Sequence, residues 1–445
     1  HYDSVEVDES FRTRLSMGIN PESFDWKLCG GESFETPEAV LCYSGEGLGA
    51  MTRHYHDFFR KYMINPRWVN ARRPVVLNSW EGMHFRFDRD RLFDTIDRIE
   101  GLGIDTFVLD DGWFGARDND HAGLGDWFVN EQKLPGGLRA VADRCHQRGL
   151  KFGLWIEPEM VNPDSDLYRA HPDWAITAPG RTPFESRNQL VLDFSRKDVV
   201  DYIKKLMCDV IASSGAEYIK WDMNRSLTEN WSHALPADRQ GEVQHRYVLG
   251  VYELARCLTE TFPDIFFEGC AGGGGRFDAA MLSFFPQIWT SDNTDAYDRV
   301  RIQYGTELIY PLSASSNHVS LSPNIRNGRI VNADTRRNIA FFGAYGYEFD
   351  VNKVPEEELA RIPADVEKYR AFESLMQTGD LYRGRTTFDD QYNDMLQVVV
   401  SKDKNHAVLV YFQALNLISL SPKIKIPGLD DNKTYRVEEF GLTLP

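Results

Sequence analysis

The chain has 445 residues, of which 42% are hydrophobic, and its formal net charge is −17. This length predicts two or three domains with a large core, and a negative charge without any basic cluster argues against a nucleic-acid partner. No apolar run approaches the roughly 20 residues that cross a bilayer, so we expect no membrane segment.

Six cysteines are scattered without a CxxC pair, which indicates neither a cysteine metal site nor a disulfide scaffold. Aromatic residues make up 13% of the chain, and their rings fill cores but also stack against flat ligand faces such as sugars. The sequence starts at His1 rather than Met and stops abruptly at Pro445. We therefore expect a part of a longer chain, with secretion and a cytoplasmic location both left open.

Residues 1–70 are mixed in character and are expected to be the tail of a β-rich domain followed by a linking helix. Glycines separate short strand-like runs such as residues 39–43. Residues 48–63 are predicted to be helical, because Met51, Tyr55, Phe58 and Phe59 fall on one side.

From residue 74 to about residue 350, strand-like runs alternate with helical segments. Nearly every run closes on an acid or an amide: residues 75–78, 106–110, 152–157, 190–193, 218–222, 265–268 and 288–292. Helices are predicted over residues 89–101, 137–148, 197–213 and 242–261. This alternation indicates a parallel sheet, and we expect an α/β (β/α)8 TIM barrel over residues 71–360. A doubly wound open sheet is the alternative, but one circular mouth collects all of these polar ends whereas an open sheet has one crevice.

Residues 361–445 are predicted to form a C-terminal antiparallel β domain that lacks its last strands. A helix is expected over residues 364–378, and alternating strands over residues 395–400, 406–411, 423–427 and 435–438. Turn signals at residues 403–405 and 428–431 each fall between two of these strands.

The run from Tyr218 to Arg225 begins as a strand and ends in charged and polar residues. Because side chains alternate along a strand, Lys220, Asp222 and Asn224 are expected on one side and the apolar residues between them on the other. A salt-bridged strand end would also explain this pattern. The stretch is nevertheless typical of a barrel rim, where ligands bind.

Carboxylates gather at the predicted strand ends: Asp110, Asp111, Glu157, Glu159, Asp222, Glu268, Asp292 and Asp295. Two carboxylates across a Trp-rich pocket suit glycoside hydrolysis, with one as nucleophile and the other as acid and base. The first four could instead ligate Mg²⁺ or Mn²⁺, and Asp111 and Glu159 could simply cap helices or pair with arginines. The glycines at residues 272–275 are a weak nucleotide signal because no Lys-Ser/Thr follows them.

Seven motifs, taken together and in order, resemble those of α-galactosidases of glycoside hydrolase family 36. The likeness runs from about residue 30 to residue 380. The motifs are residues 78–81 (NSWE), 109–114 (LDDGWF), 154–160 (LWIEPEM), 187–193 (RNQLVLD), 220–225 (KWDMNR), 270–278 (CAGGGGRFD) and 291–295 (SDNTD).

The resemblance implies a retaining enzyme without a metal or organic cofactor, in which Asp222 is the nucleophile and Asp292 the general acid/base. Asp110 and Asp111 resemble the pair that hydrogen-bonds the O4 and O6 hydroxyls of galactose. The axial O4 separates galactose from glucose, so this pair is expected to set the choice of sugar.

The family's remaining sugar contacts match further residues of this chain. Arg187 and Lys220 resemble ligands of the ring hydroxyls, and we count the neighbouring Asn224 with them. Trp80 and Trp155 resemble aromatic walls, and Cys270 and Gly273 resemble residues around the 2-hydroxyl. On sequence alone, Cys270 is as well explained as a small buried filler.

Charge arguments agree with these roles. Asp222 must be ionised to attack, and Lys220 nearby would lower its pKa. Asp292 must hold a proton until the bond breaks, so it needs a drier or less cationic setting. Retention predicts that the two carboxyl groups lie ~5–5.5 Å apart. Asp295 is the alternative candidate for the acid.

We therefore predict a retaining exo-α-galactosidase that acts on α-galactosyl oligosaccharides. An α-N-acetylgalactosaminidase and a galactosyltransferase of the raffinose-synthase kind are close alternatives. An inactive sugar-binding protein and a metal-dependent barrel hydrolase are more distant ones. Family members often form homotetramers and carry a large N-terminal β-sandwich, of which only a remnant is expected here.

Overall fold

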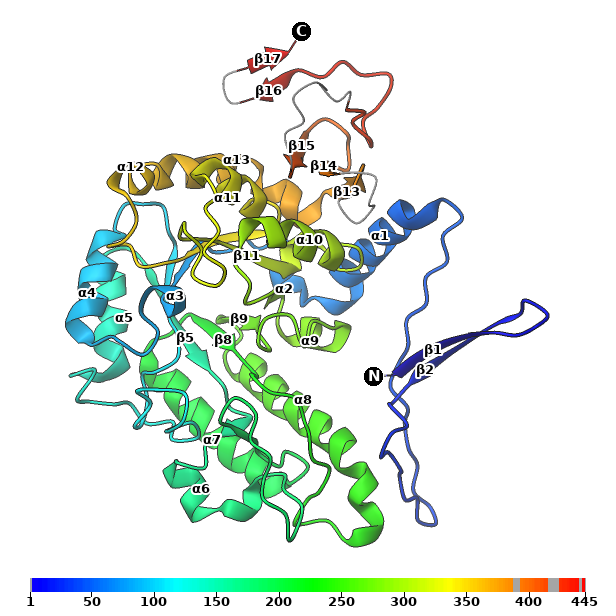
Figure 1. Ribbon diagram of the computed structural model, residues 1–445, viewed down its shortest axis with the longest axis vertical. Coiled ribbons are helices and arrows are strands. Elements are labelled where there is room, and N and C mark those ends of the chain that lie inside the picture. Colours follow the sequence, from blue (N-terminus) through cyan, green and yellow to red (C-terminus); the bar gives the residue numbers. More distant parts are fainter. Residues whose placement is uncertain (1, 387–392, 415–423, 440–441, 445) are drawn as a thin grey trace.

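The structure is a computed structural model that describes residues 2–386, 393–414, 424–439 and 442–444. Eight parallel strands close into a barrel (Figure 1), in the order β10-β11-β12-β3-β4-β5-β8-β9. The predicted (β/α)8 barrel is thus confirmed, and the open sheet is wrong. The strands are β3 (Val76–Asn78), β4 (Thr106–Leu109), β5 (Lys151–Ile156), β8 (Tyr218–Trp221), β9 (Phe266–Gly269), β10 (Gln287–Trp289), β11 (Ser315–Ser320) and β12 (Ala344–Glu348).

Helices surround the barrel, and all four that were predicted between its strands are present. These are α4 (Arg89–Arg98), α5 (Gly137–Gln147), α7 (Lys197–Ser214) and α8 (Val243–Thr261). The Asp88 side chain caps α4 by accepting from the Arg91 backbone N–H, and α7 ends at Gly215 with φ +77°. Later in the chain follow α9 (Ala279–Phe284), α10 (Ala296–Thr306), α11 (Ala333–Ala340), α12 (Glu356–Leu359) and α13 (Ile362–Thr378).

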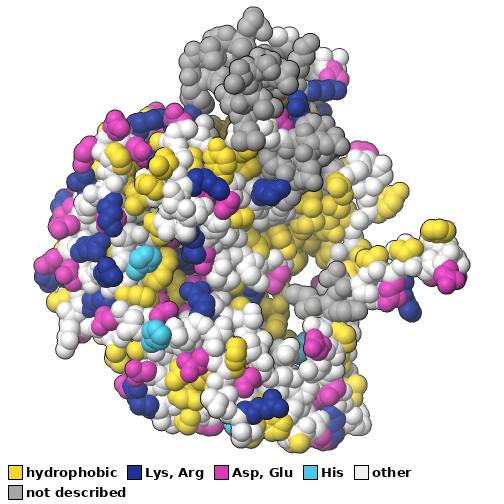
Figure 2. Space-filling view, viewed as in Figure 1, with side chains coloured by type: hydrophobic (Ala, Val, Ile, Leu, Met, Phe, Trp, Pro, Cys, Tyr) yellow, Lys and Arg dark blue, Asp and Glu magenta, His cyan; other side chains and the backbone are white. Residues whose placement is uncertain are grey.

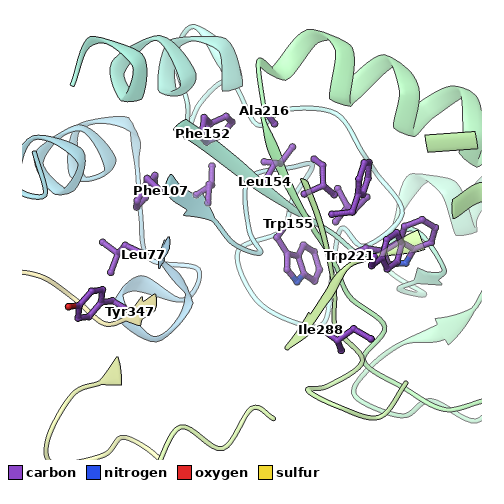
Figure 3. Packing of buried hydrophobic residues seen from close by; sticks show 14 of the residues in the cluster. Leu77, Phe107, Phe152, Leu154, Trp155, Ala216, Trp221, Ile288 and Tyr347 are labelled. Atoms are coloured by element: carbon purple, nitrogen blue, oxygen red, sulfur yellow. The ribbon is translucent and has the colours of Figure 1, made fainter. Parts of the chain in front are cut away.

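Side chains along each barrel strand alternate between two buried layers. Val108 packs with Val76, Tyr218 and Phe266 in one cluster. Its neighbours, such as Phe107, belong to the larger cluster of Figure 3. Lys220 and Asp222 follow Tyr218 at strand spacing, so the barrel positions their side chains on the Tyr218 side.

One predicted barrel strand is wrong, and two are missed. Residues 190–193 contribute β7 (Leu190–Val191), which pairs antiparallel with β6 (Met160–Val161) in a long excursion between β5 and α7. Periodicity alone does not separate so short an apolar run from a barrel strand. The strands β11 and β12 escaped prediction because their buried residues are largely polar or aromatic rather than aliphatic.

The N-terminal region holds a two-stranded hairpin of β1 (Tyr2–Val7) and β2 (Thr13–Gly18), which stands away from the barrel (Figure 1). The strand-like run at residues 39–43 is wrong, because this segment is mostly exposed and pairs with no strand in the described chain. The predicted helix is confirmed as α1 (Gly47–Phe58) continued by the π-helical turn η1 (Phe59–Met63), and α2 (Pro66–Val69) follows.

The C-terminal region begins as predicted with α13 and an antiparallel sheet. Its strands are β13 (Asp380–Arg383), β14 (Asp394–Val400) and β15 (Ala407–Gln413), followed by the hairpin of β16 (Val437–Glu439) and β17 (Leu442–Leu444). The expected strand at residues 423–427 is wrong over its described part, residues 424–427, which ends in a proline that cannot donate to a ladder. Residue 423 lies outside the described residues.

Charges of both signs are interspersed over the face of the molecule in Figure 2, without a large basic patch. Within the described ranges, no helix is both long enough and apolar enough to span a bilayer.

Candidate active site

Nine of the eleven predicted site residues line one pocket at the carboxyl ends of the barrel strands. They are Trp80, Asp110, Asp111, Trp155, Arg187, Lys220, Asp222, Asn224 and Asp292. The strands β3, β4, β5, β8 and β10 end at or just before most of them, which is why polar residues at strand ends predicted the pocket.

Asp222 directly follows β8 and is 6% exposed. Its carboxylate accepts hydrogen bonds from four N–H groups. Its Oδ1 accepts from the backbone N–H groups of Met223 at 2.8 Å and Gly272 at 3.2 Å. Its Oδ2 accepts from Trp155 Nε1 at 3.2 Å and Asn224 Nδ2 at 2.7 Å. Burial raises the pKa of Asp222, but Lys220 and these donors hold it below its ordinary value. Asp222 is therefore ionised.

Lys220 forms a buried ion pair with Asp110, with 2.9 Å between Nζ and Oδ2. The same Asp110 oxygen accepts from Asn78 Nδ2 at 2.8 Å. Burial lowers the pKa of Lys220, yet the charge of Asp110 raises it well above the ordinary value. Burial raises the pKa of Asp110 to about 6 despite the ammonium group beside it. The pair keeps a cation next to Asp222.

Asp111 and Glu159 are both held by arginines, as the alternative interpretation of these two residues proposed. Arg117 binds Asp111 with Nε–Oδ1 at 3.0 Å and Nη2–Oδ2 at 2.8 Å, while the aspartate still lines the pocket. Glu159 is fully buried outside that lining and accepts from Arg276, Trp221 and Tyr247. With both carboxylates engaged in this way, the four-carboxylate metal site is disfavoured, and the described residues contain no metal-holding group of three or more His, Cys, Asp or Glu.

Asp292 follows β10 and presents a side chain that is 34% exposed. Trp289 Nε1 donates to its Oδ1 at 3.1 Å, and Arg326 Nη2 lies 3.9 Å from its Oδ2. Burial and the charge of Asp222 raise the pKa of Asp292, against the opposing charges of Lys220 and Arg326. The two aspartates of one pocket are thus shifted in opposite directions, as the acid–base argument required.

Asp295 is occupied elsewhere. It caps α10 by accepting from the Asp298 backbone N–H at 3.0 Å, it pairs with Arg329, and it does not line the pocket. Its position therefore argues against an acid role.

Arg187, from the excursion between β5 and α7, meets Asn224, which follows β8, in the lining of the pocket. Arg187 Nη1 donates to Asn224 Oδ1 at 2.7 Å, so Asn224 links the arginine to Asp222. The arginine has φ +52°, a left-handed backbone conformation that is uncommon outside glycine. A strained backbone conformation persists only where the surrounding structure holds it, and strained residues of this kind are frequent in binding sites.

Cys270 and Gly273 lie behind the pocket rather than in its lining. Cys270 is 3% exposed, and its Sγ accepts from the Gly273 backbone N–H at 3.4 Å. At Gly273, φ is +91°, and an added Cβ would lie 2.7 Å from the Asp292 backbone nitrogen. This glycine therefore lets the turn after β9 pack against the backbone that carries Asp292.

Several lining residues escaped the sequence analysis. They are Glu81, Phe85, Arg117, Asp120, Gln189, Trp289, Thr294, Arg326 and Glu348. Glu81 and Trp289 stand inside segments that had been singled out for their neighbours. Glu348 ends β12 and Arg326 follows β11, the two strands that were missed.

Family models match most of the chain. A model described as melibiase matches residues 33–379, and one described as the glycosyl hydrolase family 36 C-terminal domain matches residues 395–444. The chain belongs to glycoside hydrolase family 36. The segments that carried the sequence resemblance all lie within these matched ranges.

Among curated relatives of this family 36 chain, alpha-galactosidase AgaA of Geobacillus stearothermophilus is 46% identical over 439 residues. The match covers 98% of this chain and 60% of the relative. Alpha-galactosidase Mel36A of Lactobacillus acidophilus is 45% identical, with 98% and 59% covered. The chain thus spans about 60% of the length of the curated relatives that it matches.

Solved structures agree closely with the fold. The crystal structure of AgaA from Geobacillus stearothermophilus superposes with a TM-score of 0.96 at 45% identity, covering 100% of this chain and 63% of that one. An alpha-galactosidase from Lactobacillus brevis gives a TM-score of 0.97 at 44% identity, with 99% and 60% covered. The barrel and the C-terminal sheet are therefore those of family 36 alpha-galactosidases.

Proposed function

We propose that this chain carries the active site of a retaining exo-α-galactosidase, which releases terminal α-linked galactose from oligosaccharides and galactosides. The observation that carries the proposal is the opposite pKa shift of two aspartates in one pocket, Asp222 downwards and Asp292 upwards. Double displacement requires one ionised carboxylate as nucleophile and a second, protonated carboxyl that donates its proton to the leaving oxygen.

In the first step an Asp222 oxygen attacks the anomeric carbon. The bond from that carbon to the leaving oxygen breaks, its electron pair goes to the oxygen, and Asp292 transfers a proton there. In the second step water attacks the anomeric carbon from the face opposite Asp222, the bond from that carbon to Asp222 breaks with its electron pair returning to the carboxylate, and Asp292 takes the water's proton. Both carboxyls then regain their starting states.

Recognition of galactose is assigned to Asp110 and Asp111. Lys220 and Arg117 fix these carboxylates without using every lone pair, because each oxygen accepts two hydrogen bonds. Both residues line the pocket. We assign their remaining lone pairs to the O4 and O6 hydroxyls. The rings of Trp80 and Trp155 supply the apolar walls on which a sugar face packs.

Related structures support the substrate class. AgaA variants of Geobacillus stearothermophilus are described in complex with raffinose, stachyose and 1-deoxygalactonojirimycin. The raffinose complex and the stachyose complex each carry a substitution of one aspartate, and these two aspartates lie 70 positions apart. The same spacing separates Asp222 from Asp292. This agreement favours Asp222 and Asp292 as the reacting pair.

We also propose the division into residues 1–70, 71–360 and 361–445, together with a homotetramer in the full-length protein. The hairpin, the barrel with its helices and the C-terminal sheet follow this order along the chain. Sedimentation equilibrium of the full-length protein tests the assembly, and a monomeric mass overturns it.

Hydrolysis of p-nitrophenyl α-galactoside beside the matching α-N-acetylgalactosaminide, with and without EDTA, tests the function in the full-length protein. We expect release from the galactoside alone, unchanged by EDTA. Preference for the acetamido sugar would mean that the space around the 2-hydroxyl is misassigned. Transfer of galactose to a second sugar in place of water would indicate a transferase, and loss with EDTA a metal-dependent hydrolase.

A further inference from the structure

The acid/base carboxyl has a dedicated hydrogen-bond donor. Trp289 is the last residue of β10, and Asp292 lies three residues further along the chain. The indole Nε1–H of Trp289 donates to Asp292 Oδ1, with 3.1 Å between nitrogen and oxygen. The other oxygen, Oδ2, accepts no hydrogen bond from the residues that the structure describes, and its nearest cation is Arg326 at 3.9 Å. The two oxygens of Asp292 are therefore not equivalent.

The indole that supplies this donor is itself held in place. Trp289 is 2% exposed. The guanidinium carbon of Arg299 lies 4.3 Å from the ring centroid, and the His318 ring lies at 4.4 Å with a tilt of 37°. His318 is in turn fixed by Glu348, with 3.2 Å between Nδ1 and Oε2. A ring packed in this way has little freedom to turn its N–H away.

Arg299 also fixes the backbone on both sides of Asp292. From α10, its Nη2 donates to the carbonyl oxygen of Ser291 at 2.6 Å, and its Nε donates to that of Asn293 at 2.7 Å. Its Nη1 donates to Asn317 Oδ1 of β11 at 3.2 Å, which ties the loop to the barrel. Arg299 is 2% exposed. One buried side chain thus restrains both the loop and the indole.

We propose that Trp289 and Arg299 are positioning residues that hold Asp292 so that Oδ2, and not Oδ1, carries the transferable proton. An N–H donor aimed at Oδ1 favours a proton on Oδ2, because the carbonyl oxygen of a carboxyl group is a better acceptor than its hydroxyl oxygen and the Trp289 hydrogen bond is stronger when Oδ1 is the carbonyl oxygen. The proton therefore resides on Oδ2, on the side of Asp292 that Arg326 approaches.

The consequence for the reaction rests on the proposed function. When the glycosidic bond breaks, the proton passes from Asp292 Oδ2 to the leaving oxygen. The negative charge that remains on the carboxylate is stabilised by the Trp289 N–H. When water attacks, its proton returns to Oδ2. Without the indole donor, the ionised form of Asp292 is disfavoured and its pKa rises.

The test is Trp289→Phe in the full-length protein, measured as kcat/KM on raffinose and on p-nitrophenyl α-galactoside. The nitrophenolate leaves without much help from an acid, whereas a sugar alcohol needs the proton. We expect activity on raffinose to fall about tenfold more than activity on the nitrophenyl substrate. The basic limb of the raffinose pH profile should move to higher pH, since the donor stabilises the carboxylate.

Trp113→Phe is the matched control, because Trp113 is fully buried in the same barrel and its Nε1 donates to the Trp155 carbonyl oxygen instead. It should lower both activities by equal factors without moving the limb. Equal losses and an unmoved limb in Trp289→Phe would overturn the inference while leaving the proposed function intact. Wild-type protein that is inactive on both substrates would instead overturn the proposed function and the inference with it.

A second replacement guards against misfolding. Benzothienylalanine at position 289 keeps the shape of the two rings and replaces N–H by sulfur. It should reproduce both the substrate-dependent loss and the shifted limb. In a further cycle, Trp289→Phe added to Asp292→Ala should cause no additional loss on the nitrophenyl substrate. Additive losses in that cycle would mean that Trp289 does not act through Asp292.

Discussion

The mouth of the barrel and the seam between α1, α10 and the C-terminal sheet both hold buried carboxyl groups with shifted pKa values. In the seam, burial raises the pKa of Glu307 to about 8. Its Oε2 accepts from Gln397 Nε2 at 2.6 Å, and its Oε1 has no partner among the described residues. In the mouth, the pKa of Asp222 is lowered while that of Asp292 is raised.

The difference shows what distinguishes a reactive site from a merely buried acid. Glu307 is fully enclosed, and burial is the main cause of its shift. In the mouth, burial raises the pKa of both carboxyls, but the buried cation Lys220 and hydrogen-bond donors outweigh it at Asp222, whereas the charge of Asp222 adds to it at Asp292. Both carboxyls line one pocket. A shifted pKa alone therefore does not identify a catalytic site, whereas two opposed shifts around a shared pocket favour the proposed one.

The largest expected effect is that of Asp222→Ala, which removes the proposed nucleophile. We expect kcat on p-nitrophenyl α-galactoside to fall roughly 10⁴-fold or more, while galactose still binds in a calorimetric titration. Asp209→Ala is the control, because Asp209 is exposed on α7 and pairs only with Lys205 in the described chain. Near-normal turnover in Asp222→Ala would refute the central assignment.

Asp292→Ala is expected to lower kcat/KM on raffinose by roughly 10²–10⁴-fold, the usual contribution of a general acid. Substrates with good leaving groups should lose less, and azide should restore their turnover by attacking the glycosyl enzyme in place of activated water. Absence of rescue would shift the acid role to another residue. Asp295→Ala, at the alternative candidate for the acid, would then be measured in the same way.

Lys220→Met removes the buried cation that lowers the pKa of Asp222. We expect a loss of about 10²-fold in kcat/KM and an acidic limb that moves to higher pH, because Asp222 loses the charge that lowers its pKa. Lys197→Met controls for charge, since Lys197 is 73% exposed and pairs with Asp201 on the surface. An unmoved acidic limb would show that the N–H donors alone keep Asp222 ionised.

Glu307→Gln should have the smallest effect on activity, within about twofold, because Glu307 lies far from the reaction in the proposed mechanism. Its effect is on stability. The pKa of Glu307 is raised from 4.5 to about 8 in the folded chain, so the folded state binds the extra proton between these values. Stability contributed by this group is thus complete below pH 4.5 and is lost as pH rises towards 8.

The glutamine cannot ionise, so the variant should gain about 4 kcal/mol at pH 8 and nothing near pH 4.5. Urea unfolding at both pH values measures this difference. A gain that is equal at both would mean that packing rather than ionisation is responsible. A large loss of activity would erase the proposed contrast between seam and mouth.

Much of the barrel could be predicted from sequence because most of its strands are apolar and end in an acid or an amide. The strand β11 breaks this rule, since Ser315, Ser316, Asn317 and His318 are buried yet polar. Neighbouring strands supply partners for these side chains, as when Gln287 Nε2 of β10 donates to Ser316 Oγ at 3.1 Å. Such a strand is recognisable only after its neighbours are placed.

The candidate site shows the same limit. Asp110, Asp222 and Asp292 were found because each follows an apolar run. An arginine partner for Asp111 was one interpretation, but the sequence did not identify Arg117, only six positions away, as that partner. A loop conformation brings the two side chains together. Arg187 was found only through family resemblance, because it precedes the strand-like run at residues 190–193 instead of following an apolar run. Residues that act by contact across loops therefore need a structure.

The hydrogen bonds of Arg299 to the loop after β10 have a consequence for how the sequence around this pocket can change. Arg299 holds the loop through the carbonyl oxygens of Ser291 and Asn293, and every amino acid supplies a carbonyl. The orientation of Asp292 is thus partly decoupled from the identity of its neighbours. A lineage, or a mutant library, can vary the side chains beside the acid and sample new leaving groups without first losing the geometry that makes the acid work.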